Sequence, residues 1–176
     1  NGFGSSANRL NDPAGVFVDK LGNIYIADKN NHRIQKWAPG ATSGITVAGG
    51  NGQGASANQL NTPYGVSVDN SGNIFVSDTY NHRIQKWAPG ATSGVTVSGG
   101  NTAGAGPDQL NEPTGVFTDV IGNIYIADQK NHRIQKWLPG ATAGITVAGG
   151  NGSGSAINQL NEPTGIFVDE VENIYI

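Results

Sequence analysis

The sequence predicts an all-β protein, a β-propeller segment made of four-stranded antiparallel blades. The first observation is that a seven-residue stretch, Asn-His-Arg-Ile-Gln-Lys-Trp, begins at Asn31, Asn81 and Asn131, a step of 50 residues without insertion or deletion. A fixed period of about 20–50 residues indicates a repeat architecture. The second is that the apolar residues occur in short bursts bounded by Gly, Pro and Asn. Such bursts are typical of strands, and no helical periodicity accompanies them.

The period divides residues 1–176 into repeats, and we interpret the whole as one propeller segment. The repeats are 1–50, 51–100, 101–150 and the incomplete 151–176. Because three and a half blades cannot close a ring, we expect the natural chain to be longer. We expect it to continue after Ile176 with Ala-Asp, a two-residue turn and a fourth copy of the seven-residue stretch.

Each unit predicts four strands in meander order. A long Gly-, Ser- and Asn-rich connection ends at Pro13, and Gly22 supplies the positive φ of a hairpin turn between the first two strands. The strands of the first unit are expected at residues 15–19, 23–28, 32–37 and 45–48. Both faces of the second strand carry apolar or amphipathic side chains, so we expect each blade to be covered on both sides by its neighbours.

Composition limits the classes of function. The formal net charge of −3 gives no general attraction for nucleic acid, whose binding depends largely on phosphate neutralisation, so we expect no nucleic-acid partner. The absence of Cys excludes disulfides and thiol chemistry. No apolar run approaches the about 18 residues of a membrane span. The chain carries no nucleophile elbow, phosphate loop or zinc signature, and we predict neither an enzyme nor a bound cofactor.

Three motifs of the unit carry a family resemblance. Pro-x-Gly-Val-x-Val-Asp, Gly-Asn-Ile-Tyr-Ile-Ala-Asp and Asn-His-Arg-Ile follow one another from Pro13 to Ile34, and this combination resembles the NHL repeat. The resemblance implies a propeller, usually of six blades, whose members mostly serve as binding platforms. Some relatives bind RNA or proteins, some are extracellular, and a few related propellers are metal-dependent lyases or lactonases. Kelch repeats are the alternative, although their glycines, aromatic residue and Trp follow a different order.

An acidic and a basic residue flank the turn between the second and third strands in every full unit. We expect them to pair across the turn and to stabilise the blade, because a feature present in every unit is more often structural than catalytic. The pairs are Asp28 with Arg33, Asp78 with Arg83, and Asp128 with Arg133.

Other repeated polar residues offer weaker candidates. His32 and its equivalents could form a ring of metal ligands, but the third strand lies away from the propeller axis. Asp19 and its equivalents end the first strand, where a ring of carboxylates could attract a cation, although a role in the hairpin turn explains them equally well. We therefore predict no metal site. We expect Trp37 and its equivalents to pack between blades rather than to bind carbohydrate. Asn151 begins the sole N-glycosylation sequon and is a glycosylation candidate.

The positions that differ between units are the candidates for binding. They lie in the connection before the first strand and in the turn between the second and third strands, which emerge on the same face of a meander blade. The opposite face repeats Pro-Gly-Ala-Thr, and we expect it to discriminate little between partners. Neutral drift in tolerant loops stays open as the alternative. The candidates are Asp12, Thr62, Tyr64, Glu112, Thr114, Lys29, Asn30, Thr79, Tyr80, Gln129 and Lys130.

These observations favour a non-enzymatic binding or assembly scaffold whose partner is a protein or a glycan. Tyr64 and Tyr80 are the aromatic candidates for an energetic hot spot. Two alternatives remain: a structural polymer or filament subunit that self-associates through the open edge of the incomplete blade, and a metal-dependent propeller lyase or lactonase. We expect an extracellular or secreted location, with a cytoplasmic one as the alternative.

Overall fold

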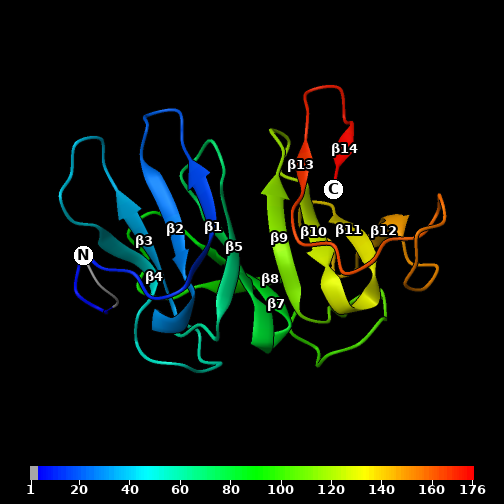
Figure 1. The fold of residues 1–176 in the computed structure, drawn as a ribbon, viewed down its shortest axis with the longest axis horizontal. Helices are drawn as coiled ribbons and strands as arrows, with labels where there is room; N and C mark the ends of the chain where they lie inside the picture. Colours follow the sequence, from blue (N-terminus) through cyan, green and yellow to red (C-terminus); the bar gives the residue numbers. More distant parts are fainter. Residues whose placement is uncertain (1–3) are drawn as a thin grey trace.

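The computed structural model describes residues 4–176 and consists of antiparallel sheets arranged side by side (Figure 1). Three sheets have four strands, each in sequential meander order, and the last has two. The first blade holds β1 (Pro13–Val18), β2 (Ile24–Asp28), β3 (Arg33–Trp37) and β4 (Ile45–Gly49), with a 3₁₀ turn, η1 (Lys29–Asn31), before β3. The prediction of four-stranded antiparallel blades is confirmed.

The other units repeat this plan. The second blade holds β5 (Pro63–Val68), β6 (Ile74–Asp78), η2 (Thr79–Asn81), β7 (Arg83–Trp87) and β8 (Val95–Gly99). The third holds β9 (Pro113–Thr118), β10 (Ile124–Asp128), η3 (Gln129–Asn131), β11 (Arg133–Trp137) and β12 (Ile145–Gly149). The fourth unit contributes β13 (Phe167–Val168) and β14 (Ile174–Tyr175).

Two strand boundaries differ from the expectation for a physical reason. His32 does not begin the third strand, because it closes the 3₁₀ turn in a left-handed conformation with φ of 52°, its N–H bonded to the carbonyl of Lys29. The first strand begins earlier, at Pro13, which pairs with Asp28 across an irregularity in the register. The turn between β2 and β3 therefore includes His32 and is one residue longer than the sequence indicated.

The core lies between blades. Val66, Val68, Ile74 and Trp87 of the second blade are buried in one cluster with side chains from the first, among them Tyr25. Trp137 occupies the equivalent place between the second and third blades. On the outer side of the first blade, Val16 and Val18 correspond to Val66 and Val68 but are 64% and 57% exposed. Each blade thus buries its apolar face only against a neighbour, as the two apolar faces of the second strand indicated.

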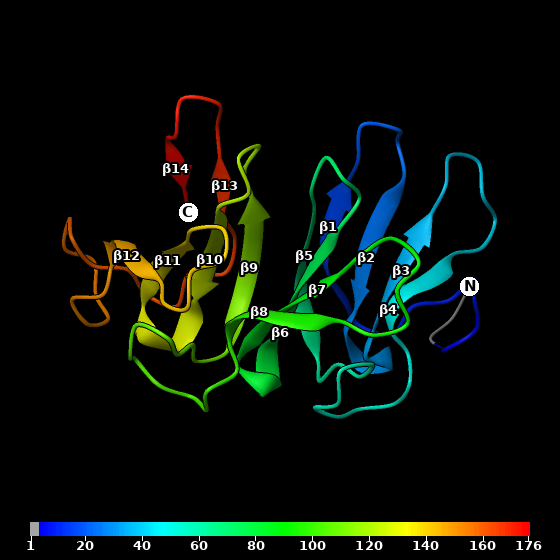
Figure 2. The same ribbon diagram turned by 180° about the vertical axis from the view of Figure 1, so that it is seen from behind.

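The first strands of adjacent blades run side by side and contact each other (Figure 2). Gly15 permits this approach, because a Cβ at this position would lie 2.5 Å from the carbonyl oxygen of Tyr64 in the next blade. No helix in the part of the chain from residue 4 onward is long and apolar enough to cross a membrane.

The loops emerge on two opposite faces, seen at the bottom and the top of Figure 1. The connection face carries the connections before the first strands and the 3₁₀ turns, which are joined by a hydrogen bond from the N–H of Asn30 to the carbonyl of Asn11 (3.1 Å). The hairpin face carries the hairpins between first and second strands and the Pro-Gly-Ala-Thr loops. There a Cβ at Gly22 would lie 3.3 Å from the ring of Pro39.

Candidate functional site

A buried aspartate organises the connection face of every full blade. Asp28 is fully buried, and its Oδ2 accepts hydrogen bonds from Arg33 Nε (2.7 Å) and Asn31 Nδ2 (2.8 Å). Its Oδ1 accepts the backbone N–H of Asn11 (2.7 Å). Asp78 and Asp128 make the same bonds in their own blades. One carboxylate therefore ties the 3₁₀ turn, the third strand and the preceding connection together.

The expected acid–base pairs form in all three blades, with N–O distances of 2.7 Å. Burial raises the pKa of Asp78 and Asp128, while hydrogen bonds from the backbone, the neighbouring Asn and the Arg work against that rise. The arginine also holds the long connection, because Arg33 Nη1 donates to the carbonyl of Ser5 (2.7 Å) and Nη2 to that of Arg9 (3.1 Å). The guanidinium groups are therefore already hydrogen-bonded within their own units.

The histidine that follows each 3₁₀ turn joins one unit to the next. His32 Nδ1 accepts the backbone N–H of Thr62 at 3.1 Å, and the same bond runs from Glu112 to His82 and from Glu162 to His132. Burial lowers the pKa of His32, with a smaller opposing effect from Asp78. The bond requires an unprotonated Nδ1, so this nitrogen acts as a structural acceptor.

Asp19 and its equivalents build the hairpin turns. Asp19 Oδ1 accepts the backbone N–H groups of Leu21 and Asn23, both at 2.9 Å, and Oδ2 accepts Asn23 Nδ2 at 2.8 Å. Asp69, Asp119 and Asp169 repeat this pattern. Within residues 4–176, no three His, Asp or Glu side chains gather in a way that would hold a metal ion.

Several variable residues do come together on the connection face. Lys130 Nζ lies 2.8 Å from Glu162 Oε1 and so bridges the third blade and the fourth unit. The pKa of Lys130 is raised chiefly by this hydrogen bond, and Glu112 and Tyr80 add to the rise. Tyr80 is 53% exposed. This mixed cluster of an aromatic ring, one amine and two carboxylates spans three units.

The remaining candidates are placed differently. In the first blade, Lys29 Nζ pairs with Asp12 Oδ2 at 2.5 Å, next to the exposed Asn30. Tyr64 is half-buried at the start of β5. Thr62 and Gln129 are half-buried as well.

Two proposed binding residues lie in the interior. Thr79 is 5% exposed and donates from Oγ1 to the carbonyl of Pro113 (2.8 Å) in the next blade. Thr114 is 2% exposed and donates in the same manner to the carbonyl of Pro163 (3.0 Å). This placement corrects the expectation that they belong to an exposed binding surface. Their hydroxyl groups join successive units.

Asn151 is exposed, but its amide group already has partners. Nδ2 donates to the carbonyl of Asn158 (2.9 Å) and to that of Gly149 (3.3 Å). Asn51, which begins no sequon, makes the equivalent two bonds in the second unit. The side chain at this position therefore closes the connection loop whether or not a sequon is present.

Sequence reasoning missed the variation on the hairpin face. The tips of the hairpins between first and second strands project there and differ strongly between units, from a polar pair in the second blade to apolar side chains elsewhere. Leu21, Val120, Ile121 and Val171 are 80%, 83%, 67% and 77% exposed. Variation between units is therefore not confined to the connection face, and the expectation that the hairpin face discriminates little between partners stays a prediction. The signal was visible in the sequence, because the two residues after each hairpin Asp change from unit to unit.

Comparisons with known proteins agree with this architecture. The model of the NHL repeat matches residues 10–37, 60–87 and 110–137. A search of the curated proteins found no match. Among solved structures, the chain is similar to a structural genomics protein of unknown function from Bacteroides thetaiotaomicron, with 21% identity and a TM-score of 0.67, over 88% of this chain and 41% of that one.

Two further structures are similar at this level. A chain of the nidogen/laminin complex shares 20% identity over 90% of this chain and 53% of that one, with a TM-score of 0.67. Streptogramin B lyase shares 17% identity over 90% of this chain and 45% of that one, with a TM-score of 0.60. The chain thus spans about half the length of these structures or less, and the likeness shows the fold. From its three matched repeats and its blades, the chain belongs to the NHL-repeat β-propeller family.

Proposed function

We propose that this protein is a non-enzymatic binding scaffold whose connection face engages a protein or a glycan. One observation carries the proposal: the Asp, Arg and His residues shared by the full units form internal hydrogen bonds, whereas some of the unit-specific residues, among them Tyr80, Lys130 and Glu162, are exposed on the connection face. Asp28, Arg33 and His32 are each committed to hydrogen bonds within or between units. Tyr80 and Lys130 lie on the same face and are exposed.

The chemistry of the cluster favours such a partner over nucleic acid. Lys130 stands beside two carboxylates, Glu112 and Glu162, so this part of the face carries no excess of positive charge. An exposed tyrosine supplies a large, rigid contact area with a hydroxyl group at its tip, which suits protein and sugar surfaces alike. The nidogen/laminin complex contains a chain of this fold in a protein assembly, which supports the choice.

The test begins by screening the purified protein against immobilised glycans and immobilised extracellular protein domains. The informative variant is Tyr80→Asn, because Asn30 occupies the equivalent position in the first blade and the substitution therefore suits the turn. Loss of a central aromatic anchor weakens binding by about 2 kcal/mol. A second variant, Tyr64→Ala, measures the contribution of the half-buried tyrosine.

The matched control is Thr92→Lys, an exposed position in the Pro-Gly-Ala-Thr loop of the hairpin face. It should leave binding of the screened partner unchanged. If Thr92→Lys abolishes binding and Tyr80→Asn does not, the partner contacts the opposite face and the proposal fails. Metal analysis of the same protein tests the alternative of a metal-dependent lyase or lactonase. Light scattering tests the alternative of a filament subunit. We also propose an extracellular or secreted location, to be tested by fractionation of the producing cells.

A further inference from the structure

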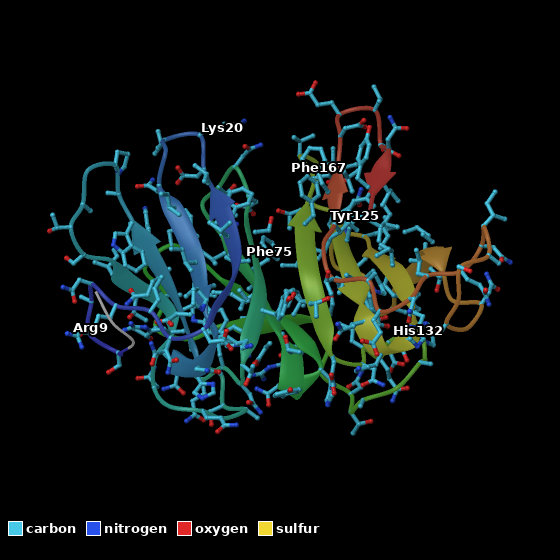
Figure 3. All side chains as sticks on the ribbon, in the orientation of Figure 1. Arg9, Lys20, Phe75, Tyr125, His132 and Phe167 are labelled. Carbon is cyan, nitrogen blue, oxygen red and sulfur yellow. The ribbon has the colours of Figure 1, made fainter. Side chains whose placement is uncertain are left out.

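A groove on the hairpin face separates the hairpin of the third blade from that of the fourth unit, and the two hairpins stand next to each other in Figures 1 and 2. Its volume is about 680 Å³. Phe117 and Phe167 form its floor in an edge-to-face contact, with ring centroids 5.3 Å apart. Val120 and Ile121 of the third blade and Val168 of the fourth unit also line it. Figure 3 shows Phe167 at the base of the last hairpin.

The apolar side chains around this groove are unusually exposed. Val120 and Ile121 are 83% and 67% exposed. Val171, at the tip of the last hairpin, is 77% exposed. Several large apolar groups in one place on a surface mark an interaction site more often than scattered single ones do. The second blade shows that the turn does not need them, because Asn70 and Ser71 stand there instead, and the hairpin bonds are the same.

The rim of the groove is acidic. Asp119, Asp169, Glu170 and Glu172 line it, and no Lys or Arg stands among its lining residues. Lys136 is a neighbouring cation, and its pKa is raised chiefly by Tyr125 and additionally by Glu172 and Asp119. Four carboxylates around an apolar floor thus outnumber the amine beside them.

The turn at the fourth unit departs from the others in a way that adds to this charge. Gly22, Gly72 and Gly122 adopt positive φ at the equivalent position, as the turn requires. Glu172 takes the same left-handed conformation with φ of 64°. A Cβ in this region is strained, so the turn geometry does not favour glutamate. The carboxylate of Glu172 adds negative charge to the lining of the groove.

We propose that this groove binds an extended segment of a partner protein that carries a large apolar side chain flanked by lysine or arginine. The apolar side chain enters between the hairpins and contacts the phenylalanine floor. The flanking cations pair with the acidic rim. The charge also argues against a lipid surface, because anionic headgroups are repelled by the four carboxylates. This interaction surface is separate from the cluster around Tyr80, on the opposite face.

The probe is a fluorescein-labelled peptide, acetyl-Lys-Lys-Leu-Phe-Lys-Lys-amide, titrated with the 176-residue protein at low salt and followed by fluorescence anisotropy. Two control peptides isolate the contributions: one replaces every Lys by Glu, the other replaces Leu-Phe by Ser-Ser. We expect the first control not to bind and the second to bind at least about tenfold more weakly. Raising the salt to about 0.5 M should weaken binding of the cationic peptide, because ions screen the rim.

The variants copy the polar turn of the second blade and so keep the hairpin geometry. One is Val120→Asn with Ile121→Ser, and the other is Glu170→Asn with Val171→Ser and Glu172→Gly. Each should weaken peptide binding at least about tenfold without changing the circular dichroism spectrum. Tyr80→Asn should leave peptide binding unchanged.

Four results would overturn the proposal. They are no binding of the cationic peptide, equal binding of its glutamate control, affinity unchanged by both turn variants, and affinity lost in Tyr80→Asn. Two further measurements address other occupants. If phosphatidylserine vesicles bind the protein and the peptide does not, the surface is a lipid site. If the turn variants abolish self-association measured by light scattering while the peptide does not bind, a second copy is the occupant.

Discussion

Replacing Arg83 by Leu tests whether the aspartate network holds the connection face together. Arg83 Nε donates to Asp78 Oδ2 at 2.7 Å, and the two side chains are 11% and 0% exposed. Breaking a buried pair by removing one partner leaves an uncompensated charge, which typically destabilises by about 3–5 kcal/mol. Asp78 keeps the bonds from the Asn61 N–H and from Asn81, so we expect the lower end, about 3 kcal/mol.

The assay is urea unfolding followed by circular dichroism. Lys86→Leu is the matched control, because Lys86 is on the same strand and its amine lies 5.5 Å from the centre of the Phe75 ring, a contact that contributes about 0.5–1 kcal/mol. The double variant Asp78→Asn with Arg83→Leu should recover part of the loss, because the unpaired charge is gone.

A second readout is local. The two Nη2 bonds from Arg83 reach the carbonyls of Ser56 and Gln59 in the connection before β5, at 3.3 and 3.4 Å. Residues 51–62 should therefore be cleaved faster by a protease in Arg83→Leu than in Lys86→Leu. Equal unfolding midpoints for the two variants, with equal cleavage of this loop, would refute the reasoning.

Three further predictions follow from the same structure. Burial lowers the pKa of His32 below the about 6.5 of an unfolded chain, so its contribution to stability is present above about pH 6.5 and is lost as the pH falls through the folded pKa. As the pH is lowered, the urea unfolding midpoint should fall less in His32→Asn than in the unsubstituted protein, because the asparagine side-chain oxygen accepts a hydrogen bond without titrating. Gly49→Ala should destabilise by at least about 1 kcal/mol more than Gly40→Ala, because both have positive φ but a Cβ at Gly49 lies 2.5 Å from the carbonyl oxygen of His32 and one at Gly40 meets open space. Trp137 is 1% exposed, so Trp137→Ala leaves a buried cavity and should lower the unfolding free energy by about 3–5 kcal/mol. Trp37 is half-buried, so Trp37→Ala should lower the unfolding free energy by clearly less. Equal losses in either pair, measured by urea unfolding, would contradict the packing described above.

Contacts within a single unit could be predicted from the sequence. The 50-residue step, the Pro-x-Gly starts and the short bursts of apolar residues predicted the four-stranded blades. The spacing of Asp28 and Arg33 across a tight turn predicted their pairing, because strands joined by such a turn place these positions opposite each other. Asp19 and Gly22 likewise predicted the hairpin turn. These features depend on residues close together in the chain, for which strand period and turn chemistry are sufficient.

Contacts between units were decided only by the tertiary structure. His32 was expected to begin a strand, yet its Nδ1 accepts an N–H 30 residues away in the next unit. Thr79 varies between units like a binding residue, yet it is buried against the third blade. Phe117 and Phe167, which line the groove together, are 50 residues apart in the sequence. The sequence period determines what each blade contains, but the distance and angle at which rigid blades stack decide which side chains meet, and those depend on packing across the whole interface.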